Sequence, residues 1–174
     1  MIVNQYYLGC LSHGSYLIGD ERSGQAVVVD PRRDIGEYLA DAAANNLTIT
    51  GVINTHFHAD FVAGHLELAQ ATGAWIGYGR RAETEYEIRT FSHGDKVSLG
   101  EVELEILETP GHTWESISVL VREQSGASPD AVLTGDALFI GDVGRPDLAA
   151  AVGADPDELA RALYASIHDV LMKL

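Results

Sequence analysis

The chain has 174 residues, with 26 acidic against 11 basic side chains and a formal charge of −15. This excess of negative charge argues against nucleic-acid binding, which favours basic surfaces, and no stretch approaches the ~20 apolar residues of a membrane helix. With 46% hydrophobic residues, the composition predicts one globular domain over residues 1–174, which we expect in the cytoplasm because the first residues lack a secretory pattern.

The first half of the chain alternates strand and helix signals. Apolar and alternating runs predict strands at residues 15–18, 26–29 and 49–54. Asp34 is expected to cap a helix over residues 35–46. A second helix is expected over residues 62–72, with Gly73 as its stop.

The second half is richer in strand signals and ends in a helix. Strands are predicted within residues 75–108, 116–123 and 131–139. Asp155 is a capping acid followed by Pro156 and, at the third position, Glu158, so a helix is expected from there to Leu174. This order of elements predicts an α/β fold with helices outside sheets.

Three loops at predicted strand ends carry the side chains that suit a metal. They contain His56, His58 and Asp60 in THFHAD, His112 in TPGHT, and Asp136 in TGDAL. Side chains two positions apart on an extended segment share a face, so the two histidines of the first loop can converge. Imidazole and carboxylate together are typical of zinc, iron or manganese sites. The three loops together predict a metal centre.

The remaining candidates have simpler interpretations. We expect surface or internally hydrogen-bonded side chains at His13, His65, His93 and His168. Cys10 is the single cysteine, which excludes an internal disulfide, and we expect a small buried residue there. Trp75 and Trp114 are expected in the core or in the wall of a cleft.

Four stretches, LGCLSHGSYLIGDE, NTHFHADFVAGH, TPGHTWESISVLV and TGDALFIGDVGRPDL, resemble the metallo-β-lactamase superfamily. Within it the chain is most similar to persulfide dioxygenases, especially those that precede a rhodanese domain in one polypeptide. The resemblance spans essentially the whole chain and implies the αββα sandwich of that superfamily. Because the family continues beyond its last helix with further strands, we expect this chain to be truncated at its C-terminus.

The resemblance also implies a cofactor, one Fe(II) per chain. Its ligands would be His56, His112 and Asp136, which leaves positions open for substrate and dioxygen. His58 and Asp60 would orient ligands and bound water through hydrogen bonds.

Phe61 follows the HxHxD loop, at a position where two-metal relatives have a histidine that binds the second ion. A phenyl ring offers no lone pair, so the sequence predicts one metal. Packing of Phe61 beneath the following helix is a simpler explanation and is compatible with the same count.

The function implied is oxidation of a low-molecular-weight thiol persulfide by O₂ to sulfite and thiol. Arg145 is expected to meet an anionic group of the substrate, or else to pair with Asp142 or Asp147. Expected partners are the thiol persulfide, O₂, a rhodanese domain and further copies of the chain in a homo-oligomer. Two alternatives stay open: a zinc-dependent thioester hydrolase of the glyoxalase II type, and an inactive or truncated domain that scaffolds a sulfurtransferase.

Overall fold

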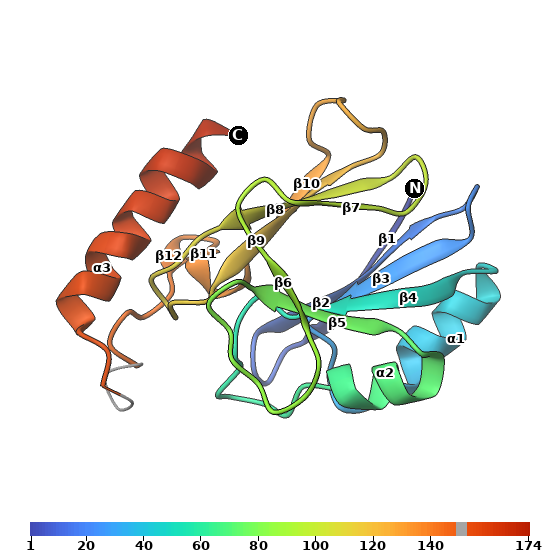
Figure 1. Cartoon of the computed structure of the whole chain (residues 1–174), viewed down its shortest axis with the longest axis horizontal. Coiled ribbons are helices and arrows are strands. Elements are labelled where there is room, and N and C mark those ends of the chain that lie inside the picture. Colours follow the sequence, from blue (N-terminus) through green and yellow to red (C-terminus); the bar gives the residue numbers. More distant parts are fainter. Residues whose placement is uncertain (149–152) are drawn as a thin grey trace.

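The computed structural model describes residues 1–148 and 153–174, which form four layers in the order helix, sheet, sheet, helix (Figure 1). In Figure 1, α1 and α2 lie on one side of the paired sheets and α3 lies on the other. The αββα sandwich expected from the sequence is therefore confirmed. No helix among these residues is long and apolar enough to span a bilayer.

Six of the described strands form the first sheet, in chain order: β1 (Ile2–Leu8), β2 (His13–Asp20), β3 (Gln25–Val29), β4 (Thr48–Ile53), β5 (Trp75–Gly79) and β6 (Arg89–Phe91). The first three strands pair antiparallel, and the pairs from β3 to β6 are parallel. Parallel strands end at the same edge of a sheet, so the loops after β3, β4 and β5 are brought together.

The second sheet is an antiparallel meander, in the order β10-β9-β8-β7. Its strands are β7 (Lys96–Ser98), β8 (Glu103–Glu108), β9 (Ile117–Arg122) and β10 (Ala131–Leu133). A short turn, η1 (Gly135–Ala137), follows β10 and leads into a small ribbon of β11 (Leu138–Phe139) and β12 (Asp142–Val143). This turn carries one of the predicted metal ligands.

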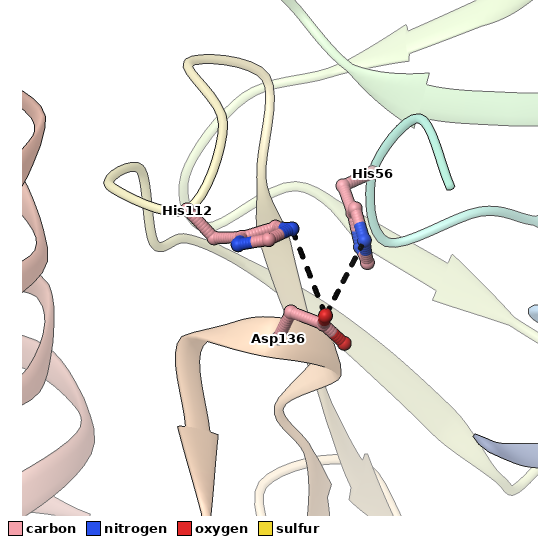
Figure 2. Close-up of side chains that lie close together, drawn as sticks. All are labelled: His56, His112 and Asp136. Carbon is pink, nitrogen blue, oxygen red and sulfur yellow. Dashed lines mark ion pairs between the residues drawn. The ribbon is translucent and has the colours of Figure 1, made fainter. Parts of the chain in front are cut away.

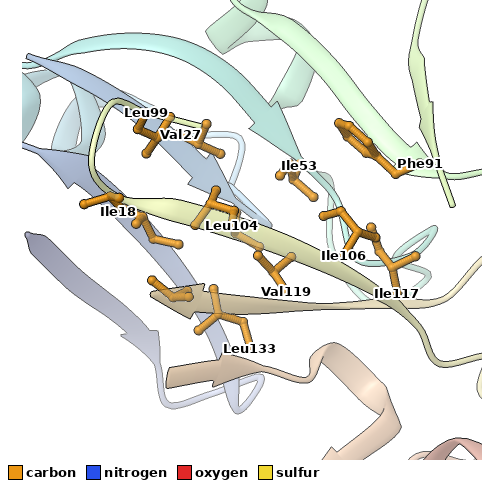
Figure 3. Close-up of a cluster of buried hydrophobic side chains, with 13 residues drawn as sticks. Ile18, Val27, Ile53, Phe91, Leu99, Leu104, Ile106, Ile117, Val119 and Leu133 are labelled. Carbon is orange, nitrogen blue, oxygen red and sulfur yellow. The ribbon is translucent and has the colours of Figure 1, made fainter. Parts of the chain in front are cut away.

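The main core lies between the two sheets and is built from the inward residues of both (Figure 3). It includes Ile18, Val27 and Ile53 from the first sheet and Ile106 and Val119 from the second, all with essentially no exposed surface. Two further apolar clusters join the helices α1 (Gly36–Ala44) and α2 (His65–Thr72) to the first sheet and α3 (Pro156–Ala165) to the second. Burial on both faces explains why the central strands are apolar runs rather than alternating ones.

Helix boundaries differ from the predictions at several ends. The first helix begins at Gly36 without a side-chain cap, because the Asp34 carboxylate accepts a hydrogen bond from the Gly36 N–H (3.2 Å) and from no later residue. The second helix begins at His65, three residues later than expected. Gly73 ends it in the left-handed conformation, as predicted.

The last helix has the predicted start. The Asp155 carboxylate accepts hydrogen bonds from the N–H groups of Asp157 (2.8 Å) and Glu158 (3.4 Å). Beyond Ala165 the chain stays helical, but with wider and then narrower turns over Ser166–Val170 and Leu171–Lys173. β1 and β12 lie outside the predicted strand ranges, and β5 to β8 share one predicted range, residues 75–108.

Candidate metal centre

The three predicted ligands meet at the edge where both sheets end (Figure 2). His56 follows β4, His112 follows β8, and Asp136 lies in η1 after β10. One donor atom from each lies within 4.8 Å of the other two. Asp136 Oδ2 is 3.9 Å from His56 Nε2 and 3.6 Å from His112 Nε2. These separations are too long for hydrogen bonds, so the three atoms converge without satisfying one another.

Neighbouring acceptors fix the tautomer of both imidazoles. The Thr55 hydroxyl donates to Asp30 Oδ2 (2.8 Å), so its oxygen accepts from His56 Nδ1 (3.0 Å). His112 Nδ1 lies 3.0 Å from the carbonyl oxygen of Arg145, which can only accept. We therefore assign the proton to Nδ1 in both rings, which leaves each Nε2 lone pair directed at Asp136. This donor set fits a divalent iron or zinc ion.

Burial controls the charge of the cluster. It lowers the pKa of His56 to about 3, with the nearby His58 acting in the same direction, so the ring is neutral at pH 7 as a metal ligand must be. Burial also raises the pKa of Asp136, although the His112 ring opposes that shift.

Sequence reasoning missed Asp30, which holds His58. The Asp30 carboxylate is buried and lies 2.8 Å from His58 Nε2, while it also accepts from the Thr55 N–H (2.7 Å). Burial would lower the pKa of His58, but the Asp30 carboxylate raises it overall. His58 is not a member of the three-donor cluster. The sequence signal for Asp30 was its position directly after the buried run Ala26–Val29. This position lies at the same edge of the sheet as the end of β4.

The other two predicted site residues lie at the surface. Asp60 is exposed, and the described part of the chain offers its carboxylate no hydrogen bond, so its role stays a prediction. The Arg145 guanidinium forms a two-point ion pair with Asp147, with distances of 3.1 and 2.7 Å. Of the two interpretations of Arg145, the structure shows the ion pair, and its contact with substrate stays a prediction.

Phe61 and His13 form a wall beside His58. The ring centroid of Phe61 lies 4.0 Å from that of His13 and 4.4 Å from that of His58. His13 begins β2, is 8% exposed, and has no hydrogen-bond partner at either nitrogen in the described residues. The expectation of a surface or hydrogen-bonded side chain is wrong for His13, because pairing of β1 with β2 turns its ring inward.

The other simple expectations have mixed outcomes. Cys10 is exposed in the β1–β2 loop, so the prediction of a buried residue is wrong. His93 and His168 are exposed as expected, and His65 Nε2 lies 2.9 Å from the Tyr86 hydroxyl. Trp75 packs against the core, also as expected.

Two further residues that the sequence did not single out shape the loops of the centre. The buried Glu115 carboxylate accepts from the Phe57 N–H (2.9 Å), which fixes the turn between the two histidines of the first loop. Gly144 lies so close to the turn of Asp136 that an added Cβ would stand 1.7 Å from the Asp136 carbonyl oxygen. Only glycine permits this approach.

Known proteins resemble this chain along its whole described length. A family model described as "Metallo-beta-lactamase superfamily" matches residues 8–174. A hydroxyacylglutathione hydrolase from Rhodospirillum rubrum is 38% identical over 133 residues, which cover 75% of this chain and 49% of that protein. The chain thus spans about half the length of this curated relative.

Solved structures of metallo-beta-lactamases and related proteins are also similar to this chain. A metallo-beta-lactamase from Staphylococcus aureus matches with a TM-score of 0.87 and 36% identity, over 97% of this chain and 52% of that one. ETHE1 from Myxococcus xanthus matches with a TM-score of 0.82 and 35% identity, over 100% of this chain and 71% of that one. TTHA1623, solved in a di-iron-bound form, matches with a TM-score of 0.72 and 26% identity, over 98% of this chain and 87% of that one.

Proposed function

Since the chain belongs to the metallo-β-lactamase superfamily, we propose that it is an iron-dependent dioxygenase acting on a low-molecular-weight thiol persulfide. The persulfide, dioxygen and water would give the thiol, sulfite and a proton. The similarity to ETHE1 from Myxococcus xanthus supports this branch of the family, which the TGDALFIGDVGRPDL stretch indicates.

One observation carries the proposal: the side chain that packs against His58 is the phenyl ring of Phe61, which offers a second metal ion no lone pair. The converging donors are then two imidazoles and one carboxylate, from His56, His112 and Asp136. An Fe(II) held by such a set supplies electrons for dioxygen and coordination sites for sulfur.

The surrounding residues prepare this set without the ion. Thr55 and the Arg145 carbonyl hold the two imidazoles in the tautomer that presents Nε2. Burial of His56 keeps water away from one side of the cluster. Phe61 places an apolar ring beside His58, which suits a sulfur atom better than a hydroxide-rich hydrolytic site.

A second candidate is a zinc-dependent thioester hydrolase. It is favoured by the 38% identity to the hydroxyacylglutathione hydrolase of Rhodospirillum rubrum. In that case His58 would present its remaining nitrogen, Nδ1, to the metal while Asp30 keeps Nε2. The two candidates therefore differ in the number and identity of the metal ions.

Metal content separates them first. We expect about one iron and little zinc per chain when the protein is produced with iron supplied and purified without oxygen, as measured by elemental analysis. Two zinc ions per chain would contradict the dioxygenase and favour the hydrolase.

Turnover then tests the reaction. Iron-loaded protein should consume oxygen and release sulfite with glutathione persulfide, and should hydrolyse lactoylglutathione negligibly. Thioester hydrolysis without persulfide-dependent oxygen uptake would reject the proposal. If the iron-bound protein shows neither activity, the result would favour an inactive domain that scaffolds a sulfurtransferase.

A further inference from the structure

A small surface hollow is lined by the guanidinium of Arg81, for which the described residues offer no carboxylate partner. Its volume is about 30 Å³, enough for a group of a few atoms, and its lining includes Arg80, Arg81, Glu108, Trp114 and Glu115. Trp114 is thus part of a cleft wall, one of the two settings expected for it.

The topology places this hollow next to the metal ligands. Strands β4 and β5 are parallel, so His56 after β4 and Arg81 after β5 leave the same edge of the sheet. Trp114 follows His112 by two residues on the opposite wall. Gly79 lets the two walls meet, because a Cβ there would lie 2.1 Å from the Glu115 carbonyl oxygen.

The two arginines of the hollow differ in their partners. Arg80 is paired with Glu108. Arg81 lies over the ring of Trp114, with its guanidinium carbon 5.1 Å from the ring centroid. The described part of the chain places no carboxylate within ion-pair distance of Arg81. Stacking on an aromatic face fixes a guanidinium plane but leaves its edge N–H groups free to donate.

We propose that Arg81, held by Trp114, determines substrate specificity by binding an anionic group, a carboxylate or phosphate, on the thiol carrier. This inference rests on the proposed function for the identity of the reacting group, but not for the binding itself. In a chain of charge −15, an anionic carrier is repelled by the surface as a whole. A local unpaired cation beside the reaction centre offsets that repulsion where the carrier must bind.

Direct binding is the first test, measured by calorimetry on iron-loaded protein with thiols that carry no sulfane sulfur. Glutathione, its diester, in which both carboxylates are esterified and only the ammonium charge remains, and 4′-phosphopantetheine are compared. At least one of the two anionic thiols should bind about tenfold more tightly than the diester, and R81Q should remove that difference. If R81Q weakens the binding of glutathione alone, the bound group is a carboxylate. If R81Q weakens the binding of phosphopantetheine alone, the bound group is a phosphate. Equal binding of all three, or an unchanged R81Q, would overturn the inference.

The matched control is R80Q, which removes the same charge from the paired neighbour. Its affinity for the two anionic thiols should stay within about twofold of wild type, since Glu108 already pairs with Arg80. Equal losses in both variants would show a general charge effect and contradict a site at Arg81.

Kinetics keep this test apart from the test of the reaction. With the persulfide of the anionic thiol, R81Q should raise KM about tenfold and leave kcat unchanged. With the persulfide of the diester, R81Q should change neither constant. If no variant consumes oxygen, the dioxygenase proposal fails while a binding difference at Arg81 still stands.

Discussion

Each imidazole of the metal centre is oriented by an oxygen that accepts its Nδ1 proton. For His56 this oxygen belongs to Thr55, which Asp30 holds in turn, and for His112 it is the Arg145 carbonyl. Such outer partners fix ring orientation and raise ligand basicity. At the residue scale, metal affinity should therefore depend on residues that never touch the ion.

The ligands themselves give the clearest prediction. H56A, H112A and D136A should each abolish tight metal binding, because three protein bonds become two. H58A should weaken binding by about 10–100-fold, as expected for a side chain that acts through other residues. The metal-to-protein ratio after gel filtration against a chelator measures both effects. Complete loss of metal in H58A would identify His58 as a direct ligand.

Thr55 provides a test of the outer partners. T55V removes the acceptor of the His56 proton and one donor to Asp30, so metal affinity should fall about 10–100-fold while the fold is kept. Chelator competition measures the affinity. T48V, an exposed change in the strand that precedes Thr55, is the control and should leave the affinity unaltered. Equal affinities for T55V and wild type would show that His56 needs no such support.

At the scale of elements, the metal loops are held in place by packing against their neighbours. The helix that starts at Pro156 docks on the loop of His112: the Ser166 hydroxyl donates to the Pro110 carbonyl (2.7 Å). A Cβ on Gly111 would lie 2.3 Å from the Leu163 Cβ, and the φ of Gly111 is +144°. The loop and the helix therefore specify each other's position.

G111A should destabilise the protein by about 2–4 kcal/mol, since overpacking and backbone strain each cost about 1–3 kcal/mol. Urea unfolding measures the loss. G9A is the matched control, because a Cβ at Gly9 meets no atom within 4 Å. A G111A protein as stable as G9A would contradict the tight helix–loop contact.

Asp20 joins the two sheets at the opposite end from the metal centre. Its carboxylate accepts from the N–H groups of Arg22 (2.9 Å) and Glu101 (2.7 Å). Burial would raise the pKa of Asp20, but these N–H donors lower it overall. A depressed folded-state pKa contributes stability at pH values above the unfolded pKa of about 4 and loses it as the pH falls through the folded value.

D20N should accordingly lower the free energy of unfolding at pH 7 by about 1–3 kcal/mol. The difference from wild type should narrow as the pH falls below about 4. Urea titrations of both proteins across this range measure it, and the comparison cancels other titrating groups. If the difference in free energy of unfolding stays constant with pH, the charge of Asp20 does not contribute to stability.

At the scale of the whole molecule, the metal ligands come from both halves of the sandwich. His56 follows a strand of the first sheet, and His112 and Asp136 follow strands of the second. An ion bound by all three would tie the sheets together at one end, as the apolar core does along their length (Figure 3).

Removal of the metal should therefore lower the melting temperature. Binding to the native state alone adds about 2.7 kcal/mol when free metal is at a hundred times Kd. Calorimetric melting before and after chelation measures the shift, and D136A should show none because it no longer holds the ion. An unchanged Tm in wild type would mean that the cluster binds metal weakly.

The sequence alone determined the layered fold and the three ligand loops. Both depend on local signals: apolar runs give strands, and His56, His112 and Asp136 each lie within a few residues of a strand end. The start of the last helix was equally predictable, because Asp155 and the two residues after it form a cap within one turn.

The tertiary structure decided what depends on contacts between strands distant in sequence. Only the parallel pairing of β3 with β4 brings Asp30 to His58, and only the β1–β2 register turns His13 inward and leaves Cys10 exposed. The partner of Arg81 is likewise set by the meeting of loops after β5 and β8. A side chain's type and local pattern fix its possible chemistry, but its neighbours across the sheet fix which of those possibilities it realises.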